Sequence, residues 1–178
     1  MRSGRLFHIA KGGTQVITAI CPGSFDPVTL GHLDIIRRAS DMFDRVIVAV
    51  LCNSKKNPSF TVEERMAMIR RITADIPNLE VATFDGLLAD FARLQGATVL
   101  VKGLRAVTDF EYEFQMALAN RKLNPNLETV FITTKAENMY LASSLVKEIA
   151  RNGGCIDDFV PEALREEIQM RLSKGETV

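Results

Sequence analysis

The sequence has no net charge, and this absence limits the partners it can attract. Its 22 lysine and arginine residues balance 22 aspartate and glutamate residues over a length of 178. A chain without an overall field does not draw in nucleic acid or an anionic membrane by long-range electrostatics. Any site that binds an anion must therefore be built locally.

Long apolar runs and paired cysteines are also missing. No stretch approaches the roughly 20 apolar residues that a membrane-spanning helix needs. The basic start, residues 1–15, is too broken for a secretory signal, and we interpret it as an N-terminal extension or a vector-derived segment. Cys21, Cys52 and Cys155 form no C-x-x-C pair, which indicates a reduced chain. We expect a cytoplasmic protein that binds neither membrane nor nucleic acid.

Short apolar runs alternate with longer amphipathic segments after residue 15. Strands buried on both faces are predicted at 16–20, 46–51, 97–101 and 129–132, with a more mixed edge strand at 79–84. Helices are predicted at 33–43, 61–73, 87–94, 108–123, 143–151 and 161–172. The alternation predicts an α/β fold in a single domain over 16–178, with a doubly wound five-stranded parallel sheet.

In such a sheet, ligands bind beyond the carboxyl ends of the strands. The segments that follow the strands are GSFDPVTLGH, CNSKKNPSFT, FDGLLADFA, KGLRAVTDFEYE and TTKAENMYLASS. Four of them contain basic residues or clustered hydroxyl groups, which suit phosphate, and the third offers an apolar wall. The sequence therefore predicts a phosphate site at this edge, although the P-loop and G-x-G-x-x-G signatures are both absent.

His32 is the first candidate for chemistry at this edge. It starts a helix, whose N-terminal N–H groups and partial positive charge favour phosphate. The positive helix end should lower the pKa of His32, and either charge form can donate to a phosphoryl oxygen. A lone histidine at a helix start is more often structural, but T-x-G-H after a G-S-F-D-P turn is a specific combination.

A second group of polar residues follows the later strands. Ser143 and Ser144 start a helix, with Lys147 one turn further on. By itself this pattern indicates ordinary serine N-capping, whereas opposite the first helix it predicts a triphosphate cradle. Lys102 and Arg105 follow a buried strand and complete the positive set.

The reaction that fits these loops is phosphoryl or nucleotidyl transfer. The loops contain neither a strong metal-ligand cluster nor the G-x-S-x-G elbow of a serine hydrolase. Catalysis of phosphoryl transfer depends mainly on positioning and charge stabilisation. A phosphate monoester is largely a dianion at neutral pH, so it can attack the α-phosphorus of ATP without a general base.

At these residues the chain resembles a known family. GSFDPVTLGH and ASSLVKE resemble the nucleotidyltransferase superfamily with T-x-G-H, and KGLRAVTDFEYEFQMALANRKL resembles the bacterial phosphopantetheine adenylyltransferases. The resemblance implies a Rossmann-like nucleotidyltransferase fold and reversible adenylyl transfer from ATP to 4′-phosphopantetheine, giving 3′-dephospho-CoA and pyrophosphate. It also implies Mg²⁺, a homohexamer, and CoA as a feedback inhibitor.

The resemblance assigns roles to single residues. It makes His32 the stabiliser of the transition state, with Lys56 and Ser24 as further catalytic residues. It implies that 4′-phosphopantetheine binds Ser24, Lys56, Leu88 and Lys102. The implied ATP contacts are Ser24, Phe25, His32, Gly103, Leu104, Arg105, Glu113, Asn138, Met139, Tyr140, Leu141, Ala142, Ser143 and Ser144. No residue is assigned to a metal ion.

The chain departs from the family pattern at two of these positions. Lys102 stands where the family usually has arginine, which replaces a bidentate grip by a point charge. Ala142 stands in place of the first serine of the usual triple. Both changes could alter the affinity for the acceptor, and neither removes the predicted chemistry.

Two other functions remain open at this point. Another nucleotidyltransferase, with nicotinate mononucleotide or glycerol 3-phosphate as acceptor, would share T-x-G-H, although K-G-L-R-A and F-E-Y-E argue for phosphopantetheine. The other alternative is a non-catalytic nucleotide-binding or CoA-sensing module. The intact His32 and Lys56 argue against it, because a sensor need not stabilise a transition state.

Overall fold

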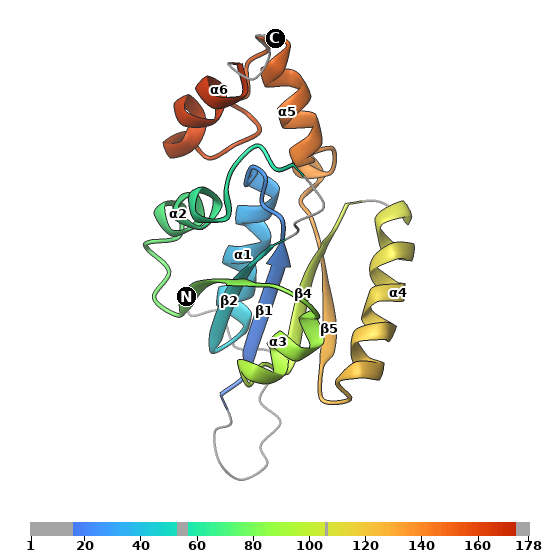
Figure 1. Ribbon diagram of the computed structural model, residues 1–178. Coiled ribbons are helices and arrows are strands. Elements are labelled where there is room, and N and C mark those ends of the chain that lie inside the picture. The colour runs from blue at the N-terminus through green and yellow to red at the C-terminus, as the bar shows by residue number, and fades with distance from the viewer. Residues whose placement is uncertain (1–15, 53–56, 106, 174–178) are drawn as a thin grey trace, which may run out of the picture.

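The structure is a computed structural model that describes residues 16–52, 57–105 and 107–173. Its centre is a five-stranded sheet with the strand order β3-β2-β1-β4-β5 (Figure 1). The strands are β1 (Thr18–Gly23), β2 (Arg45–Leu51), β3 (Leu79–Phe84), β4 (Val99–Leu104) and β5 (Glu128–Thr133). All neighbouring strands pair in parallel, which confirms the predicted doubly wound sheet. The mixed strand, β3, lies at an edge as predicted.

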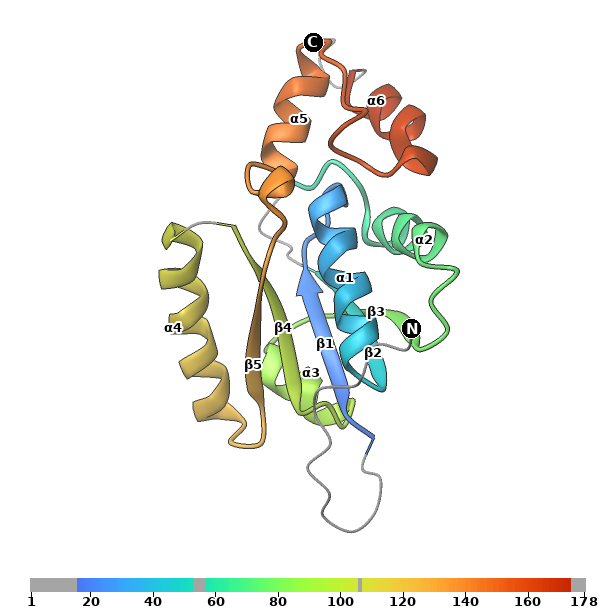
Figure 2. The same ribbon diagram turned by 180° about the vertical axis from the view of Figure 1, so that it is seen from behind.

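Helices cover both faces of this sheet. They are α1 (Leu30–Met42), α2 (Val62–Ile72), α3 (Leu88–Leu94), α4 (Val107–Leu123), α5 (Ser143–Arg151) and α6 (Arg165–Ser173). The helices α1 and α2 lie on one face and α3 and α4 on the other (Figures 1 and 2). The helices α5 and α6 lie beyond the carboxyl ends of the strands, next to the edge where ligands are expected. No helix in the described ranges is long and apolar enough to cross a membrane.

The central strands bury both of their faces. In β2, Val46, Val48 and Val50 belong to the core under α1 and α2, whereas Ile47 and Ala49 belong to the core under α3. Because successive side chains of a strand point to opposite faces, a strand covered on both sides reads as an unbroken apolar run. This is why β2 was recognisable from the sequence.

Several element boundaries differ from those predicted. The strand β1 runs on to Gly23 and pairs with β2 along its length, although its apolar run ends at Ile20. The helix α4 begins at Val107, so the predicted capping residue Thr108 lies inside the helix. The predicted helix at 161–172 is a short 3₁₀ turn, η2 (Glu162–Leu164), followed by α6. The capping box of Thr61 and Glu64 at the start of α2 is confirmed.

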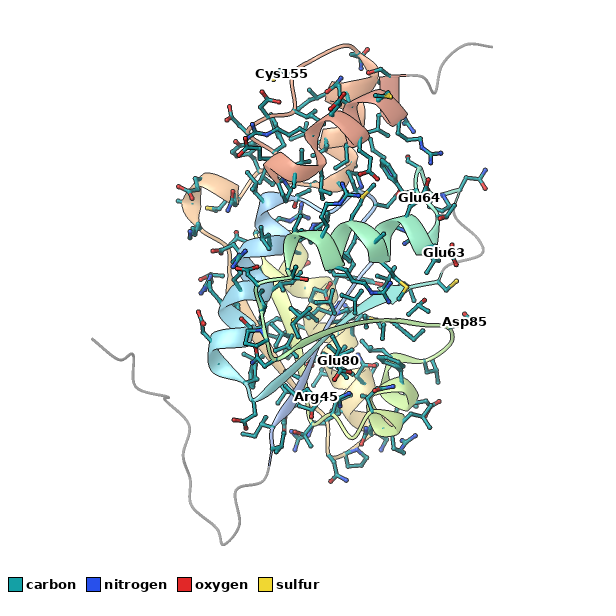
Figure 3. All side chains as sticks on the ribbon, turned by 90° about the vertical axis from the view of Figure 1, so that its left-hand side faces the viewer. Arg45, Glu63, Glu64, Glu80, Asp85 and Cys155 are labelled. Atoms are coloured by element: carbon teal, nitrogen blue, oxygen red, sulfur yellow. The ribbon has the colours of Figure 1, made fainter. Side chains whose placement is uncertain are left out.

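The amino ends of the strands are joined by an ion pair. Arg45 on β2 donates from Nε to Glu80 Oε1 at 3.0 Å and from Nη2 to Oε2 at 2.8 Å. The hydrogen bond with Arg45 lowers the pKa of Glu80 below its usual value. Figure 3 shows the two residues side by side, far from Cys155 at the α5–α6 end. This pair therefore holds β2 to β3 at a distance from the ligand edge.

Candidate active site

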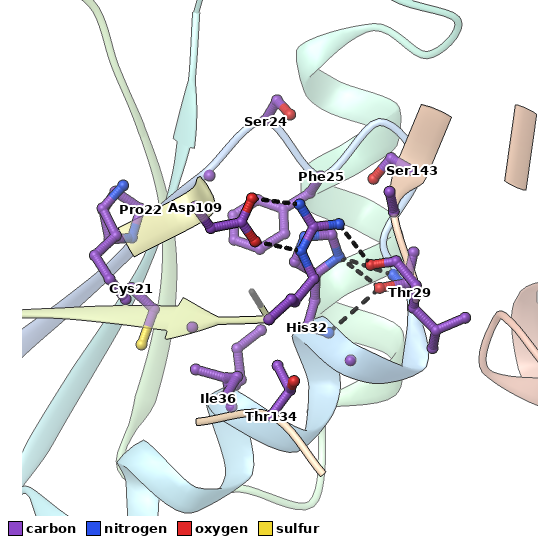
Figure 4. A pocket seen from close by; sticks show the side chains of 18 of the residues that line it. Cys21, Pro22, Ser24, Phe25, Thr29, His32, Ile36, Asp109, Thr134 and Ser143 are labelled. Carbon is purple, nitrogen blue, oxygen red and sulfur yellow. Dashed lines mark hydrogen bonds and ion pairs between the residues drawn. The ribbon is translucent and has the colours of Figure 1, made fainter. Parts of the chain in front are cut away.

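A cleft of about 720 Å³ opens at the carboxyl ends of β1 and β4 (Figure 4). Its walls come from the β1–α1 loop, the start of α1, the end of β4, the start of α4 and the segment before α5. The predicted site residues that line it are Ser24, Phe25, His32, Lys102, Gly103, Arg105, Glu113, Asn138, Leu141, Ala142, Ser143 and Ser144. Residues separated by up to 120 positions in sequence thus meet in one cavity at the predicted edge.

The turn after β1 has an unusual backbone. Phe25 has a φ of 49°, a left-handed conformation that bulky residues rarely adopt and that costs about 1–3 kcal/mol. Its ring folds back over Gly23, where an added Cβ would lie 2.9 Å from Phe25 Cζ. Only glycine therefore allows this ring position. The turn leaves Ser24 exposed at the mouth of the cleft.

His32 is held in one tautomer by the residue that caps its helix. The backbone N–H of Thr29 donates to His32 Nδ1 at 3.0 Å, and the His32 backbone N–H donates to Thr29 Oγ1 at 3.3 Å (Figure 4). Because Nδ1 accepts a hydrogen bond from a backbone amide, the proton of the neutral ring lies on Nε2. Nε2–H is then the donor that His32 can offer to the cleft.

The pKa of His32 is lowered from 6.5 to about 4, first by burial and second by the positive charge of Arg105. The edge of the Phe25 ring contributes to this burial, with its centroid 5.1 Å from that of His32. The lowering was predicted from the helix end, whereas burial is its main cause. His32 is therefore a neutral hydrogen-bond donor at neutral pH.

Arg105 is fixed in the cleft by two partners. It donates from Nε to Asp109 Oδ2 at 2.9 Å and from Nη2 to Oδ1 at 3.2 Å, and from Nη1 to the Leu141 carbonyl at 2.8 Å. Asp109 was not predicted as a site residue, although its four-residue spacing from Arg105 was a usable signal. This bidentate pair sets the guanidinium orientation before any ligand binds.

Lys102 also has a carboxylate partner in the cleft. Its Nζ lies 3.1 Å from Glu113 Oε2, and both side chains are about four-fifths buried, with 22% and 21% exposed. An anion that binds Lys102 must therefore share it with Glu113 or displace that carboxylate.

The start of α5 is tied to the β1–α1 loop. Ser143 donates from Oγ to the Pro27 carbonyl at 2.8 Å, while the N-cap position belongs to Ala142, which makes no side-chain capping bond. The N-capping interpretation of Ser143 is therefore wrong. Lys147 does not line the cleft; its Nζ lies 2.9 Å from the buried Asp26.

The remaining predicted residues lie elsewhere. Leu88 packs against the core under α3. Leu104 ends β4 without lining the cleft. Met139 and Tyr140 are exposed, and the Tyr140 ring contacts Phe159 edge-on at 5.9 Å. Lys56 lies outside the described residues.

Metal-binding side chains do not gather in the part of the chain that the structure describes. No group of three histidine, cysteine or acidic residues there could hold an ion. The two acidic residues of the cleft, Asp109 and Glu113, each face a cation of the protein instead. A metal ion in this cleft would thus take its ligands largely from bound phosphates and water.

Comparisons with known proteins agree with this geometry. The cytidylyltransferase-like family model matches residues 20–149. A protein of Caldanaerobacter subterraneus subsp. tengcongensis named phosphopantetheine adenylyltransferase is 54% identical over 157 residues, covering 88% of this chain and 98% of that protein. The chain belongs to the phosphopantetheine adenylyltransferase family.

Other relatives extend this picture. The phosphopantetheine adenylyltransferase of Alkaliphilus metalliredigens is 59% identical over 143 residues, which cover 80% of this chain and 91% of that one. A solved nicotinic acid mononucleotide adenylyltransferase from Plasmodium falciparum has a TM-score of 0.61 at 14% identity, covering 90% of this chain and 97% of that chain. The second likeness concerns the fold alone, so a phosphopantetheine adenylyltransferase shares its architecture with enzymes that have other acceptors.

Proposed function

We propose that this chain transfers an adenylyl group from ATP to 4′-phosphopantetheine, reversibly, and releases pyrophosphate. The product is 3′-dephospho-CoA, in the penultimate step of CoA biosynthesis. The observation that carries the chemistry is the neutral His32, fixed with its proton on Nε2 in a cleft that also contains Lys102 and Arg105. The acceptor is supported by the relatives named phosphopantetheine adenylyltransferase at 54–59% identity.

Catalysis needs only positioning and charge stabilisation from the protein. The acceptor phosphate attacks the α-phosphorus of ATP in line, and pyrophosphate leaves from the opposite side. In the transition state, negative charge is redistributed over the α-phosphoryl oxygens. A fixed donor such as His32 Nε2–H stabilises this charge most effectively there. Because the pKa of His32 is about 4, the ring is neutral at pH 7 and contributes a hydrogen bond from Nε2–H rather than a positive charge.

The two substrates are assigned to different walls of the cleft. ATP would bind between the start of α1 and the segment before α5, with Arg105 and the hydroxyl groups of Ser143 and Ser144 near its phosphates. The acceptor phosphate would bind Lys102 and Ser24, with Lys56 as a further cation and Leu88 beside the pantetheine arm. Glu113 stays assigned to the ATP side, with Gly103, Asn138, Leu141 and Ala142 of the cleft wall. Leu104, Met139 and Tyr140 stay assigned to ATP as well, although their side chains lie outside that wall.

A divalent metal ion fits this scheme, and we assign it as Mg²⁺. Bound by the triphosphate, the ion would neutralise part of its charge and help pyrophosphate to leave. Asp109 and Glu113 are engaged by Arg105 and Lys102, so they orient the protein cations rather than supply a ligand cage.

CoA is the inhibitor that this cleft would accept. It contains the same phosphopantetheine arm as the acceptor, joined to an adenine nucleotide, so it can occupy both substrate positions at once. Its binding would then compete with both substrates.

A homohexamer is the assembly that we propose. The helix α4 presents large apolar side chains to solvent, including Tyr112 at 64% and Leu118 at 56% exposed. Phe110 stacks on Phe114 on the same surface. Such a surface supports self-association, and light scattering on the purified protein would give the mass. One nucleotidyltransferase domain over 16–178 and a cytoplasmic location remain predictions.

The reaction is tested by incubating the protein with ATP, Mg²⁺ and 4′-phosphopantetheine. Mass spectrometry should detect 3′-dephospho-CoA, and a coupled assay should detect an equal amount of pyrophosphate. Nicotinate mononucleotide and glycerol 3-phosphate serve as control acceptors. Turnover of a control acceptor in place of phosphopantetheine would contradict the assignment, and ATP binding without any product would indicate a nucleotide sensor.

A further inference from the structure

Arg65, on α2, is buried behind the wall of the cleft. Only 4% of its surface is exposed, and it forms no ion pair within the described ranges. Its guanidinium donates to backbone carbonyl groups: from Nη1 to Ser24 at 2.6 Å and to Leu51 at 3.4 Å, and from Nε to Thr61 at 3.2 Å. Arg65 thus joins the first turn of α2 to the carboxyl ends of β1 and β2.

A charge at this position is unexpected from helix packing alone. Met68, Ile69 and Ile72, on the same face of α2, are all buried, and an apolar residue at 65 would continue their pattern. Burying a guanidinium without a carboxylate costs free energy that an apolar side chain would not. The role of Arg65 therefore lies in the backbone carbonyl groups that it holds in place.

The strongest contact of Arg65 is to the turn that precedes His32. The Ser24 carbonyl carbon belongs to the peptide unit before Phe25, so fixing this carbonyl restricts the φ of Phe25. That φ is 49°, a conformation that persists only where its surroundings enforce it. The Phe25 ring in turn lies edge-on against His32, as Figure 4 shows.

We propose that Arg65 is a positioning residue for adenylyl transfer. From behind the cleft, it holds the Ser24 carbonyl and thereby the turn that places Ser24 at the cleft mouth and Phe25 against His32. The catalytic consequence rests on the proposed function, whereas the link from Arg65 to His32 does not. The two parts are therefore tested by different measurements.

The main variant is Arg65→Met, which keeps an unbranched side chain and removes the donors. Arg70→Met is the matched control, because Arg70 lies on the same helix and donates to the carbonyl of Val81, on the edge strand. We expect Arg65→Met to stay folded by circular dichroism and to lower kcat about 10- to 100-fold, as expected for a small misplacement of reacting groups. Arg70→Met should keep the parent kcat.

The link to His32 is measured without turnover, by NMR titration of the ring. His8 and His32 are the two histidines of the sequence, so a His8→Asn background leaves a single histidine ring to titrate. With the Phe25 wall loosened in Arg65→Met, water reaches the ring and its pKa should rise toward about 6.5. Arg105, whose charge also lowers this pKa, and its partner Asp109 are unchanged in both variants.

Arg65→Lys separates positioning from folding. Lysine keeps the charge but lacks the planar guanidinium that donates to several carbonyl groups at once. We therefore expect a smaller loss of kcat and a smaller rise in the pKa of His32 than with methionine.

If either folded variant keeps both the parent kcat and the parent His32 titration, the proposal is overturned. Lower thermal stability with an unchanged titration would also overturn it, since that result describes a purely structural arginine. If the parent makes no dephospho-CoA but its His32 titration responds to Arg65, the proposed function fails and the structural link stands.

Discussion

The backbone N–H of Thr29 lies 3.0 Å from Nδ1 of His32, and this bond decides which ring nitrogen is left for a substrate. Thr29 Oγ1 lies at the same distance from Nδ1 and also accepts the His32 backbone N–H. The helix cap and the orientation of the catalytic ring are therefore one arrangement. It explains why a histidine at this helix start can donate to phosphate while remaining neutral.

Replacement of His32 by alanine should lower kcat by roughly 10²–10³-fold, a typical loss for one transition-state donor. The KM values should change less, because the bond strengthens mainly in the transition state. Steady-state kinetics measure both parameters, with circular dichroism to check the fold and His8→Ala as the control. An unchanged kcat in a folded His32→Ala variant would remove His32 from the mechanism.

Acid should destabilise the protein through His32. Its pKa is 6.5 in the reference state and about 4 in the folded one, so the unfolded chain binds the extra proton between these values. His32 therefore contributes on the order of 3 kcal/mol to the free energy of unfolding above about pH 6.5. This contribution is lost as the pH falls toward 4.

Urea unfolding at pH 7 and pH 4.5 measures this effect. Carboxylates titrate in the same range, so the quantity that matters is the difference between the parent and His32→Asn. The parent should lose more stability between the two pH values than the variant does. Equal losses would mean that the folded pKa of His32 is not lowered.

Lys102→Ala should mainly weaken acceptor binding. Loss of a charge-assisted bond to phosphate corresponds to roughly a 10- to 100-fold higher KM for 4′-phosphopantetheine. The KM for ATP should stay close to that of the parent.

Lys102→Arg is the matched variant, since it keeps the charge and can bind phosphate through two N–H groups. We expect it to bind the acceptor at least as well as the parent. If ATP binding weakened and acceptor binding held, Lys102 would belong to the nucleotide side.

The sequence predicted the sheet well because its signals are local. The buried run in β2 and the capping box of α2 report their own segments, and T-x-G-H marks the end of the first loop. Arg65 and Asp26 escaped prediction for the opposite reason. Asp26 contacts Lys147, 121 positions away, and Arg65 contacts Ser24, and no spacing rule connects such pairs.

The predicted site residues divide in the same way, into those that a local motif locates and those that depend on the three-dimensional fold. Residues of the motifs at helix starts, such as His32 in α1 and Ser143 in α5, line the cleft because these two helix starts meet there. Met139 and Tyr140 were assigned with their neighbours by resemblance, yet in the structure their side chains are exposed and do not line the cleft. Within residues 138–144 these two side chains face solvent while the others line the cleft, so resemblance places the segment and not each side chain.

The Asp26–Lys147 pair should stabilise the junction between the β1–α1 loop and α5. Asp26 also accepts the backbone N–H groups of Ser59 and Phe60, at 3.1 and 3.0 Å, so its carboxylate joins three segments. Lys147→Met leaves this buried carboxylate without its cation and should cost about 1–3 kcal/mol of unfolding free energy. Asp26→Asn should cost a similar amount.

Because the residues touch, the double variant should be more stable than the sum of the two single losses predicts. Chemical denaturation of the four proteins gives the coupling energy. A value near zero would mean that the two side chains contribute independently, and that the attachment of α5 rests instead on the bond from Ser143 to the Pro27 carbonyl.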